Sequence, residues 1–291
     1  MSIRVRAAAV QAEPMWLDLA AGVEQTIGLI EDAAAGGAEL VAFPETFLPG
    51  YPWWLWLESV DWGTEFRSRY LANAMSRDSA ELSAIARTAR RVGIRVVLGF
   101  AERAERNLYM AQAMVSPDGQ VDISRKAWPT PLERAVFAAG ARTPTVYYTE
   151  LGRIGMLGGA DHLCPQRRMD LWREQIHVAA WSGFTIYHEV SEEIVMAVNS
   201  DVSEQYARAA GVVVIAPTAL VPMIGWHAVD ARTPGQRLLG VGGLARILGP
   251  DGRDLAPPLP PGSTGLLFAD VVLGGSARPD ADEHPSARWV G

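Results

Sequence analysis

The sequence predicts an α/β protein whose mixed β-sheet is covered by helices on its faces. Short apolar runs, such as 153–159 (RIGMLGG) and 211–217 (GVVVIAP), alternate with longer segments of helical periodicity. The runs are apolar throughout, which is typical of strands buried on both faces. The turn sequence Pro117-Asp118-Gly119 lies between two further strand-like runs and predicts a hairpin, so the sheet is not purely parallel.

The first half of the chain follows this alternation closely. A strand at 5–13 precedes an amphipathic helix at 17–35 and a short apolar strand at 39–45. A second helix at 79–92 leads into strands at 94–102 and 107–115, the latter running into the predicted hairpin turn.

The second half adds strands at 153–159, 175–181 and 211–217, with helical patterns between them. A second hairpin is expected from 244–259 into 265–273, and its proline-rich part reads as a connection rather than a linker. No repeat or break in composition appears. We therefore expect one domain over 1–291, with the final residues a short tail.

Composition narrows the function to small-molecule chemistry. The chain has 291 residues, 49% of them hydrophobic, a formal charge of −7 and one cysteine, Cys164. No apolar stretch is long enough for a membrane span, no basic stripe points to nucleic acid, and the five histidines lack metal-ligand spacing. We expect a cytoplasmic protein without metal or cofactor, acting on a small molecule.

The stretch 40–56 (LVAFPETFLPGYPWWLW) contains the first candidate site residue. Glu45 follows a buried strand, and ligands bind at strand ends in α/β sheets. Tyr51, Trp53, Trp54 and Trp56 would partly desolvate it and raise its pKa toward the range of a general acid or base. The alternative is a solvated loop whose tryptophans pack a subunit contact.

A second candidate segment is 123–134 (ISRKAWPTPLER). It places Lys126 and Glu133 around a Pro-Thr-Pro turn, and a lysine near Glu45 would stabilise developing negative charge. Taken alone, the two are more often ordinary surface residues.

Together these stretches resemble the nitrilase (carbon–nitrogen hydrolase) superfamily over nearly the whole chain. FPETFLPGYPWW resembles the segment of the catalytic glutamate, which implies that role for Glu45. RKAWPTPLER implies Lys126 as the catalytic lysine and Glu133 as the second glutamate. EQIHVAAWSGF resembles the arylacetonitrilase and cyanide-converting branch. The resemblance implies an αββα four-layer sandwich with subunits paired through their faces, as a dimer or larger homo-oligomer.

The sequence departs from this family where its nucleophile is expected. Such nitrilases read roughly Cys-Ala-Glu-His-Leu, whereas this chain reads Gly159-Ala160-Asp161-His162-Leu163. The nucleophile position thus falls on Gly159, which cannot form a covalent adduct. Cys164 lies five residues further on, and we expect a helix to begin near it. Five helical residues correspond to about 500° of rotation and about 7.5 Å of rise, which is too far for Cys164 to replace the missing nucleophile simply.

Two further residues are candidates for substrate binding. His162 and Trp181 complete the set with Tyr51, Trp53 and Trp54, and the tryptophans favour an apolar or aromatic substrate. The alternative for His162 is a helix-start or subunit-contact residue. For Trp181 it is a place in the core, and His177 reads as a structural histidine.

Loss of a nucleophile costs about 10⁶ in turnover where catalytic groups act as a unit, so thiol-dependent nitrile hydrolysis should be absent. The first hypothesis is non-covalent acid/base chemistry by Glu45 and Lys126 on a nitrile, amide, aldoxime or related compound, with the freed space at Gly159 admitting a bulkier substrate or a water. The alternative is a catalytically silent binding or regulatory subunit. A single inactivating replacement fits less well, because Asp161 departs from the family as well.

Overall fold

The structure, a computed structural model, describes residues 3–56, 60–141, 145–164, 167–168, 171, 173–183, 192–220 and 242–274. For residues 54, 56, 60–65, 160 and 192–198 it describes the backbone alone. The expected C-terminal tail lies outside these ranges.

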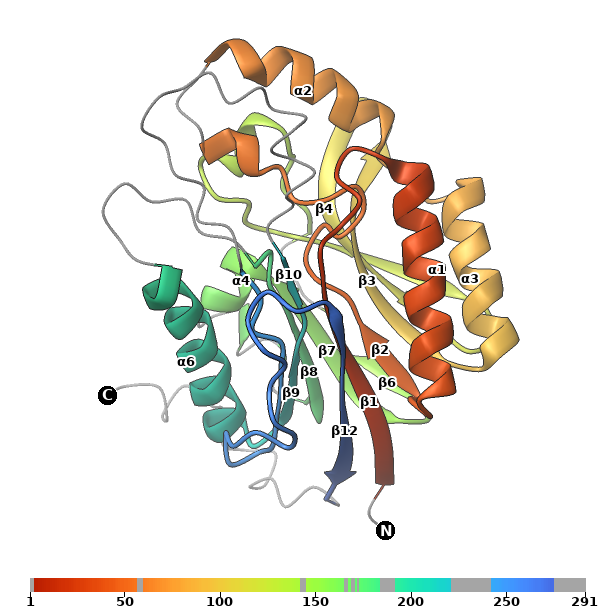
Figure 1. Cartoon of the computed structure of the whole chain (residues 1–291), viewed down its shortest axis with the longest axis vertical. Coiled ribbons are helices and arrows are strands. Elements are labelled where there is room, and N and C mark those ends of the chain that lie inside the picture. The colour runs from red at the N-terminus through yellow and green to blue at the C-terminus, as the bar shows by residue number, and fades with distance from the viewer. Residues whose placement is uncertain are drawn as a thin grey trace.

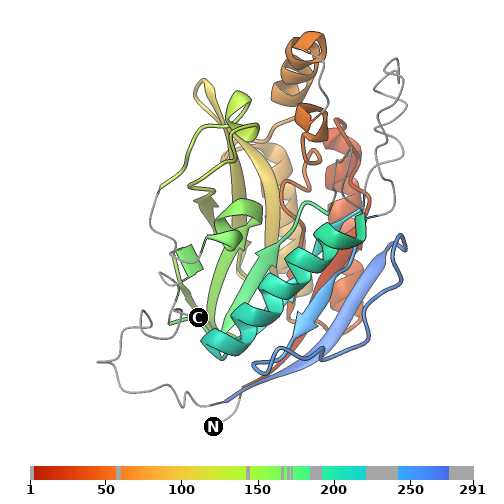
Figure 2. The same ribbon diagram turned by 90° about the vertical axis from the view of Figure 1, so that its left-hand side faces the viewer.

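Two β-sheets form the centre of the molecule (Figures 1 and 2). The first has the order β10-β1-β2-β3-β4-β5, with β12 also paired to β1. Its strands are β1 (Ile3–Ala12), β2 (Leu40–Ala42), β3 (Arg95–Ala104), β4 (Asn107–Val115), β5 (Val121–Arg125), β10 (Thr218–Ala219) and β12 (Gly265–Leu273). Strands β1, β2 and β3 are parallel, whereas β4, β5 and β12 run antiparallel to their neighbours.

The second sheet has the order β11-β9-β8-β7-β6. Its strands are β6 (Tyr147–Thr149), β7 (Gly152–Gly158), β8 (Ile176–Ala180), β9 (Val213–Ala216) and β11 (Arg246–Leu248). The three central strands β7, β8 and β9 are parallel, and both outer strands are antiparallel. Mixed sheets were expected from the hairpin turns, and this prediction is confirmed.

Alternate residues of β1 belong to two different apolar layers. Ala8, Val10 and Ala12 pack in the cluster that also contains residues of α1 (Leu19–Ala35) and α3 (Ala80–Val92). Val5, Ala7 and Ala9 pack instead with the second sheet. The uniform apolar pattern of the strand therefore reflects burial on both faces.

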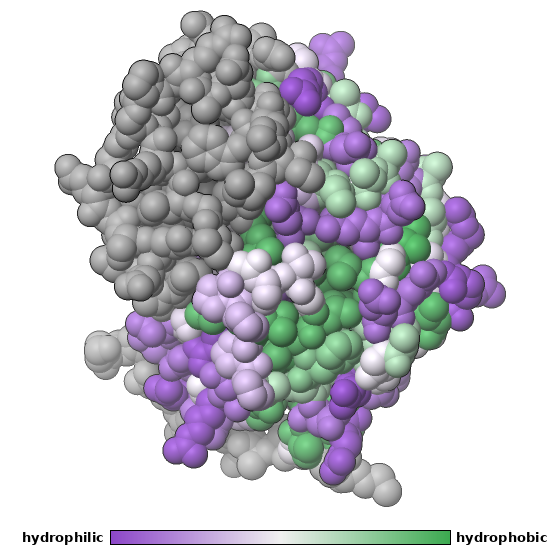
Figure 3. Space-filling model, in the orientation of Figure 1, coloured by the Kyte–Doolittle hydropathy of each residue, from purple (hydrophilic) through white to green (hydrophobic). Residues whose placement is uncertain are grey.

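A third apolar cluster lies on the outer face of the second sheet, where α6 (Glu192–Ala210) covers β8 and β9. The layers are helix, sheet, sheet and helix, so the predicted αββα sandwich is confirmed (Figure 2). In the space-filling view, hydrophobic residues gather in the centre of one face and polar residues border them (Figure 3).

The predicted helix starts are confirmed to within two residues. The Asp18 side chain accepts a hydrogen bond from Ala21 N and caps α1, and Ser79 caps α3 by accepting from Leu82 N. Helix α2 (Val60–Ala72) follows the short 3-10 helix η1 (Trp53–Trp56). Within the described residues, no helix is both long and apolar enough to cross a membrane.

The second predicted hairpin is wrong in its pairing. The Pro250-Asp251-Gly252 turn does form, with Leu248 bridged to Asp254. However, β11 pairs with β9 in one sheet, and β12 pairs with β1 in the other. The proline-rich connection carries the chain between sheets, because the buried residues of β12 complete the apolar layer that separates them.

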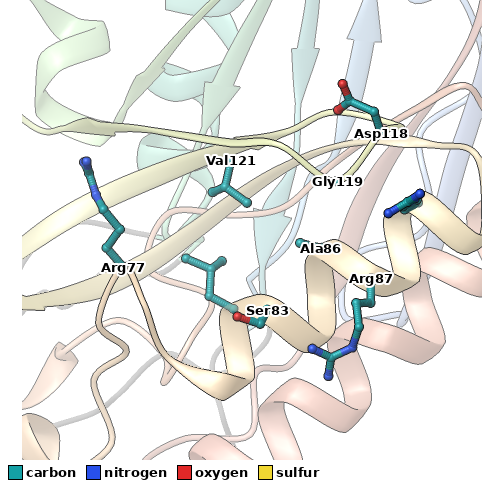
Figure 4. Close-up of a pocket in the computed structure, with 9 residues that line it drawn as sticks. Arg77, Ser83, Ala86, Arg87, Asp118, Gly119 and Val121 are labelled. Carbon is teal, nitrogen blue, oxygen red and sulfur yellow. The ribbon is translucent and has the colours of Figure 1, made fainter.

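A surface cavity of about 280 Å³ lies between α3 and the β4–β5 turn, and arginines lie along its lining. Arg77 and Arg87 point in different directions, and Asp118 lies on the opposite wall (Figure 4). Since its cations do not converge, this cavity lacks the geometry of an anion site.

Candidate active site

Three chain segments that leave strands of the two sheets bring the candidate residues together. Glu45 lies three residues after β2, Lys126 directly follows β5, and Gly159 directly follows β7 as the first residue of α4 (Gly159–Leu163). The first two come from one sheet and the third from the other. Packing of the two sheets thus assembles this site.

The segment that carries Glu45 crosses closely over β3. Phe43 N donates to Val97 O at 2.8 Å, and Leu48 N donates to Gly99 O at 3.3 Å. A β-carbon on Gly99 would lie 2.0 Å from Pro44 O, so only glycine permits this approach. The hydrogen bonds to β3 and the close contact at Gly99 therefore fix the backbone of the segment that carries Glu45.

Lys126 joins the two glutamates. Its Nζ donates to Glu45 Oε1 at 2.9 Å and to Glu133 Oε1 at 3.1 Å. Tyr51 Oη also donates to Glu133 Oε1, at 2.5 Å, and Thr130 N donates to Glu133 Oε2 at 2.7 Å. The three charged residues form one hydrogen-bonded cluster, as their resemblance to the family's site residues led us to expect.

Burial controls the charges in this cluster. Glu45, Lys126 and Glu133 are 4%, 7% and 2% exposed. Burial raises the pKa of Glu45 to about 7, against the opposing effect of Lys126. Burial would lower the pKa of Lys126, but the two carboxylates outweigh it and raise that pKa above its usual range. Glu45 is thus the group that exchanges a proton near neutral pH, while Lys126 stays charged.

Glu133 keeps its charge for a different reason. Burial would raise its pKa, but Lys126 and the hydrogen bonds from Tyr51 and Thr130 lower it below the usual value. The two carboxylates on either side of Lys126 therefore have opposite pKa shifts, a pattern that separates a proton-exchanging group from a permanently charged one.

Asp161, a further candidate catalytic residue because it replaces the family's glutamate in shortened form, contacts the backbone of the segment that carries Lys126. Its carboxylate accepts from Ala127 N at 2.8 Å and from Trp128 N at 2.9 Å, and Arg167 Nη2 lies 3.5 Å away. These amides directly follow Lys126. Asp161 thus ties α4 to the segment of Lys126 and positions that lysine.

Gly158 and Gly159 lie against the Glu45 carboxylate. A β-carbon on Gly159 would lie 2.5 Å from Glu45 Oε2 and 3.1 Å from Lys126 Nζ, and one on Gly158 would lie 2.5 Å from Glu45 Oε1. Gly159 also has φ +41°, a left-handed conformation that other residues rarely adopt. The expectation of an open space beside Gly159 is wrong on this side, because the carboxylate fills it.

The aromatic candidates are mostly packed inside the protein. Tyr51 is 6% exposed and supports Glu133, and Trp53 is 2% exposed and packs on Trp16 with ring centroids 4.9 Å apart. Trp181 is 5% exposed and its Nε1 donates to Ser203 Oγ at 3.3 Å. The side chain of Trp54 lies outside the described residues. Tyr51 thus contacts the charged cluster directly, whereas Trp53 and Trp181 pack in the core.

His162 is fully buried in this single chain, so the alternative of a subunit contact is wrong. Its Nδ1 lies 3.0 Å from His177 Nε2, and His177 Nδ1 lies 2.9 Å from Glu174 Oε2. Tyr206 Oη donates to the other oxygen of Glu174. This chain of hydrogen bonds fixes α4 to β8 and α6 and confirms His177 as a structural residue.

Cys164 precedes a further helical turn, as expected: its carbonyl accepts from Arg168 N at 3.3 Å, and residues 167 and 168 are helical. Helix α4 begins at Gly159, and Cys164 caps its end with an extended backbone. Among the residues that the structure describes, no group of three histidine, cysteine, aspartate or glutamate side chains is arranged to hold a metal ion.

Sequence reasoning missed Gly99, Gly158 and Glu174. The adjacent glycines at 158 and 159 were a visible signal, but a glycine pair alone does not reveal which side chain lies against it.

Comparison with known proteins identifies relatives over most of the chain. The profile of the family described as carbon–nitrogen hydrolase matches residues 6–278. An arylacetone-specific nitrilase of Alcaligenes faecalis is 42% identical over 274 residues, covering 92% of this chain and 77% of the relative. An arylacetonitrilase of Aspergillus niger is 36% identical over 305 residues, covering 100% of this chain and 92% of the relative.

Solved structures show the same fold. An amidase of the nitrilase superfamily from Nesterenkonia superposes with a TM-score of 0.68 at 20% identity, covering 98% of this chain and 94% of that one. A CN-hydrolase superfamily protein from Xanthomonas campestris gives a TM-score of 0.70 at 17% identity, covering 94% and 91%.

Proposed function

Because the chain belongs to the carbon–nitrogen hydrolase family, we propose that it hydrolyses a small nitrile or amide without a cysteine nucleophile, by acid–base chemistry of Glu45 and Lys126. In this proposal Gly159 occupies the position of the family's nucleophile. The observation that carries it is the buried, hydrogen-bonded cluster of Glu45, Lys126 and Glu133 directly beside a residue with no side chain.

Glu45 is the base in this reaction. With a pKa of about 7 it is available in both protonation states near neutral pH, which suits proton transfer in either direction. Its ionised form takes a proton from a water whose oxygen bonds to the nitrile or amide carbon.

Lys126 stabilises the negative charge that develops on the nitrile nitrogen or amide oxygen. Glu133, held by Tyr51 and Thr130, keeps this lysine charged and aimed at Glu45. The proton held by Glu45 then passes to the substrate nitrogen, which stays in the product of nitrile hydration and leaves as ammonia in amide hydrolysis. A nitrile gives an amide after one water, and a second water releases ammonia and leaves a carboxylic acid.

The names of the relatives support an arylaliphatic nitrile or the corresponding amide as substrate. We also propose a homo-oligomer, a dimer or larger, paired through the sandwich faces. Size-exclusion chromatography that shows a monomer would contradict this part.

A turnover screen by mass spectrometry tests the proposal with arylaliphatic nitriles, amides and aldoximes. We expect wild type to form product, Glu45→Gln and Lys126→Ala to form none, and Cys164→Ser to match wild type. Unchanged turnover by Lys126→Ala would contradict the mechanism. Ligand-induced thermal stabilisation without product would favour a silent binding subunit instead, and loss of activity in Cys164→Ser would indicate a relocated thiol.

A further inference from the structure

We propose that Gly158 and Gly159 form a side-chain-free seat for the Glu45 carboxylate, and that this seat sets the position of the carboxylate and its contact with Lys126. The catalytic meaning of this inference rests on the proposed function, whereas the seat itself is a matter of contact geometry and is testable without turnover.

Both oxygens of the Glu45 carboxylate lie against this seat. Oε1 lies 2.5 Å from the β-carbon position of Gly158, and Oε2 lies 2.5 Å from that of Gly159. Real β-carbons essentially never approach a heavy atom so closely, so a side chain at either position requires the carboxylate, which is the free end of a flexible side chain, to shift. Two adjacent glycines at the junction of β7 and α4 thus serve the same side chain.

The space is too narrow for a water between the carboxylate and Gly159. A carbon–carbon bond adds about 1.5 Å, which places Glu45 Oε2 within about 4 Å of Gly159 Cα. A water between the two would lie about 2.8 Å from Oε2. The remaining distance to Gly159 Cα is too short for a second contact. The attacking water must therefore approach Glu45 from another direction, while the seat holds the carboxylate from behind.

The seat also maintains the contact with Lys126. Oε1, which rests on Gly158, is the oxygen that accepts the lysine's hydrogen bond at 2.9 Å. A β-carbon on Gly159 would additionally lie 3.1 Å from Lys126 Nζ. A side chain at either glycine would separate carboxylate from ammonium while both remain buried.

The glycines are distinguishable by substitution. Gly158 has an ordinary extended backbone (φ −118°, ψ 140°), so Gly158→Ala changes the contact alone. Gly159→Ala changes the contact and strains a left-handed backbone. Gly211 has φ +64° with nothing within 4 Å of its β-carbon position, so Gly211→Ala supplies the strain alone as a matched control.

Titration of Glu45 by carbon-13 NMR of glutamate carboxyl groups, assigned with Glu45→Gln, measures the seat directly. We expect a midpoint of about 7 in wild type. In Gly158→Ala and Gly159→Ala it should rise by about one unit, because the lysine's effect weakens while burial persists. Gly211→Ala should match wild type. An unchanged midpoint in Gly158→Ala, with the fold intact by circular dichroism, would overturn the seat.

Turnover provides the second readout. A displacement of about 1 Å costs about 10²-fold, so Gly158→Ala and Gly159→Ala should each lose about that much of the wild-type activity in kcat. Unchanged kcat in Gly158→Ala would overturn the proposal. If wild type has no turnover, the function fails while the titration still decides the seat.

Discussion

At the residue scale, burial gives Glu45 a proton affinity unlike that of the neighbouring Glu133. Glu133 accepts hydrogen bonds from a tyrosine, a backbone amide and a lysine, whereas Glu45 accepts one from Lys126 within the part of the chain that the structure describes. The two carboxylates therefore stabilise Lys126 together but only Glu45 titrates in the neutral range.

This difference predicts a pH effect on stability. A folded-state pKa of about 7 against an ordinary value of 4.5 means that the folded protein binds the proton more tightly than the unfolded chain. The contribution of Glu45 is therefore most favourable below pH 4.5 and is lost as the pH rises toward 7, by up to about 3 kcal/mol. Glu45→Gln should remove this loss, so the variant gains stability relative to wild type from pH 5 to pH 8 in urea unfolding. A constant difference between the two proteins across that range would refute the shift.

At the element scale, the site depends on how closely the segment after β2 crosses β3. The sequence predicted both strands and placed Glu45 at a strand end, because apolar runs and turn residues are local features. It did not predict the crossing, since nothing near Gly99 in the sequence shows that Pro44 lies 2.0 Å from its β-carbon position.

Gly99→Ala tests this crossing. The added methyl would meet backbone rather than a flexible side chain, so we expect a loss of about 1–3 kcal/mol in unfolding free energy together with reduced turnover as Glu45 moves. Gly28→Ala is the matched control: Gly28 lies in α1 with nothing within 4 Å, and alanine there should stabilise by up to about 1 kcal/mol. Equal effects from both substitutions would rule out a special close approach at Gly99.

At the scale of the whole molecule, the sequence predicted the layers better than the way in which they are joined. The apolar runs indicated sheets buried on both faces, and the motifs indicated the charged cluster. The second hairpin was misassigned because strand-like runs and a turn do not reveal that β11 and β12 belong to different sheets. The glycine seat was missed because it joins residues 45 and 158–159, which only the packing of the two sheets brings together.

This origin of the site predicts that the layer between the sheets supports activity more than the outer layers do. Ile176 on β8 and Ile30 on α1 are both 0% exposed, but Ile176 packs between the sheets and Ile30 packs between helix and sheet. Truncation to alanine should cost about 2–5 kcal/mol in either case. Only Ile176→Ala removes packing from the layer between the sheet that leads to Glu45 and the sheet that leads to Gly159. At equal folded fraction, its turnover should therefore fall further than that of Ile30→Ala. Urea unfolding of both variants, and their turnover under conditions where each stays folded, are the measurements to compare. Equal turnover would mean that the seat does not depend on how the two sheets pack on each other.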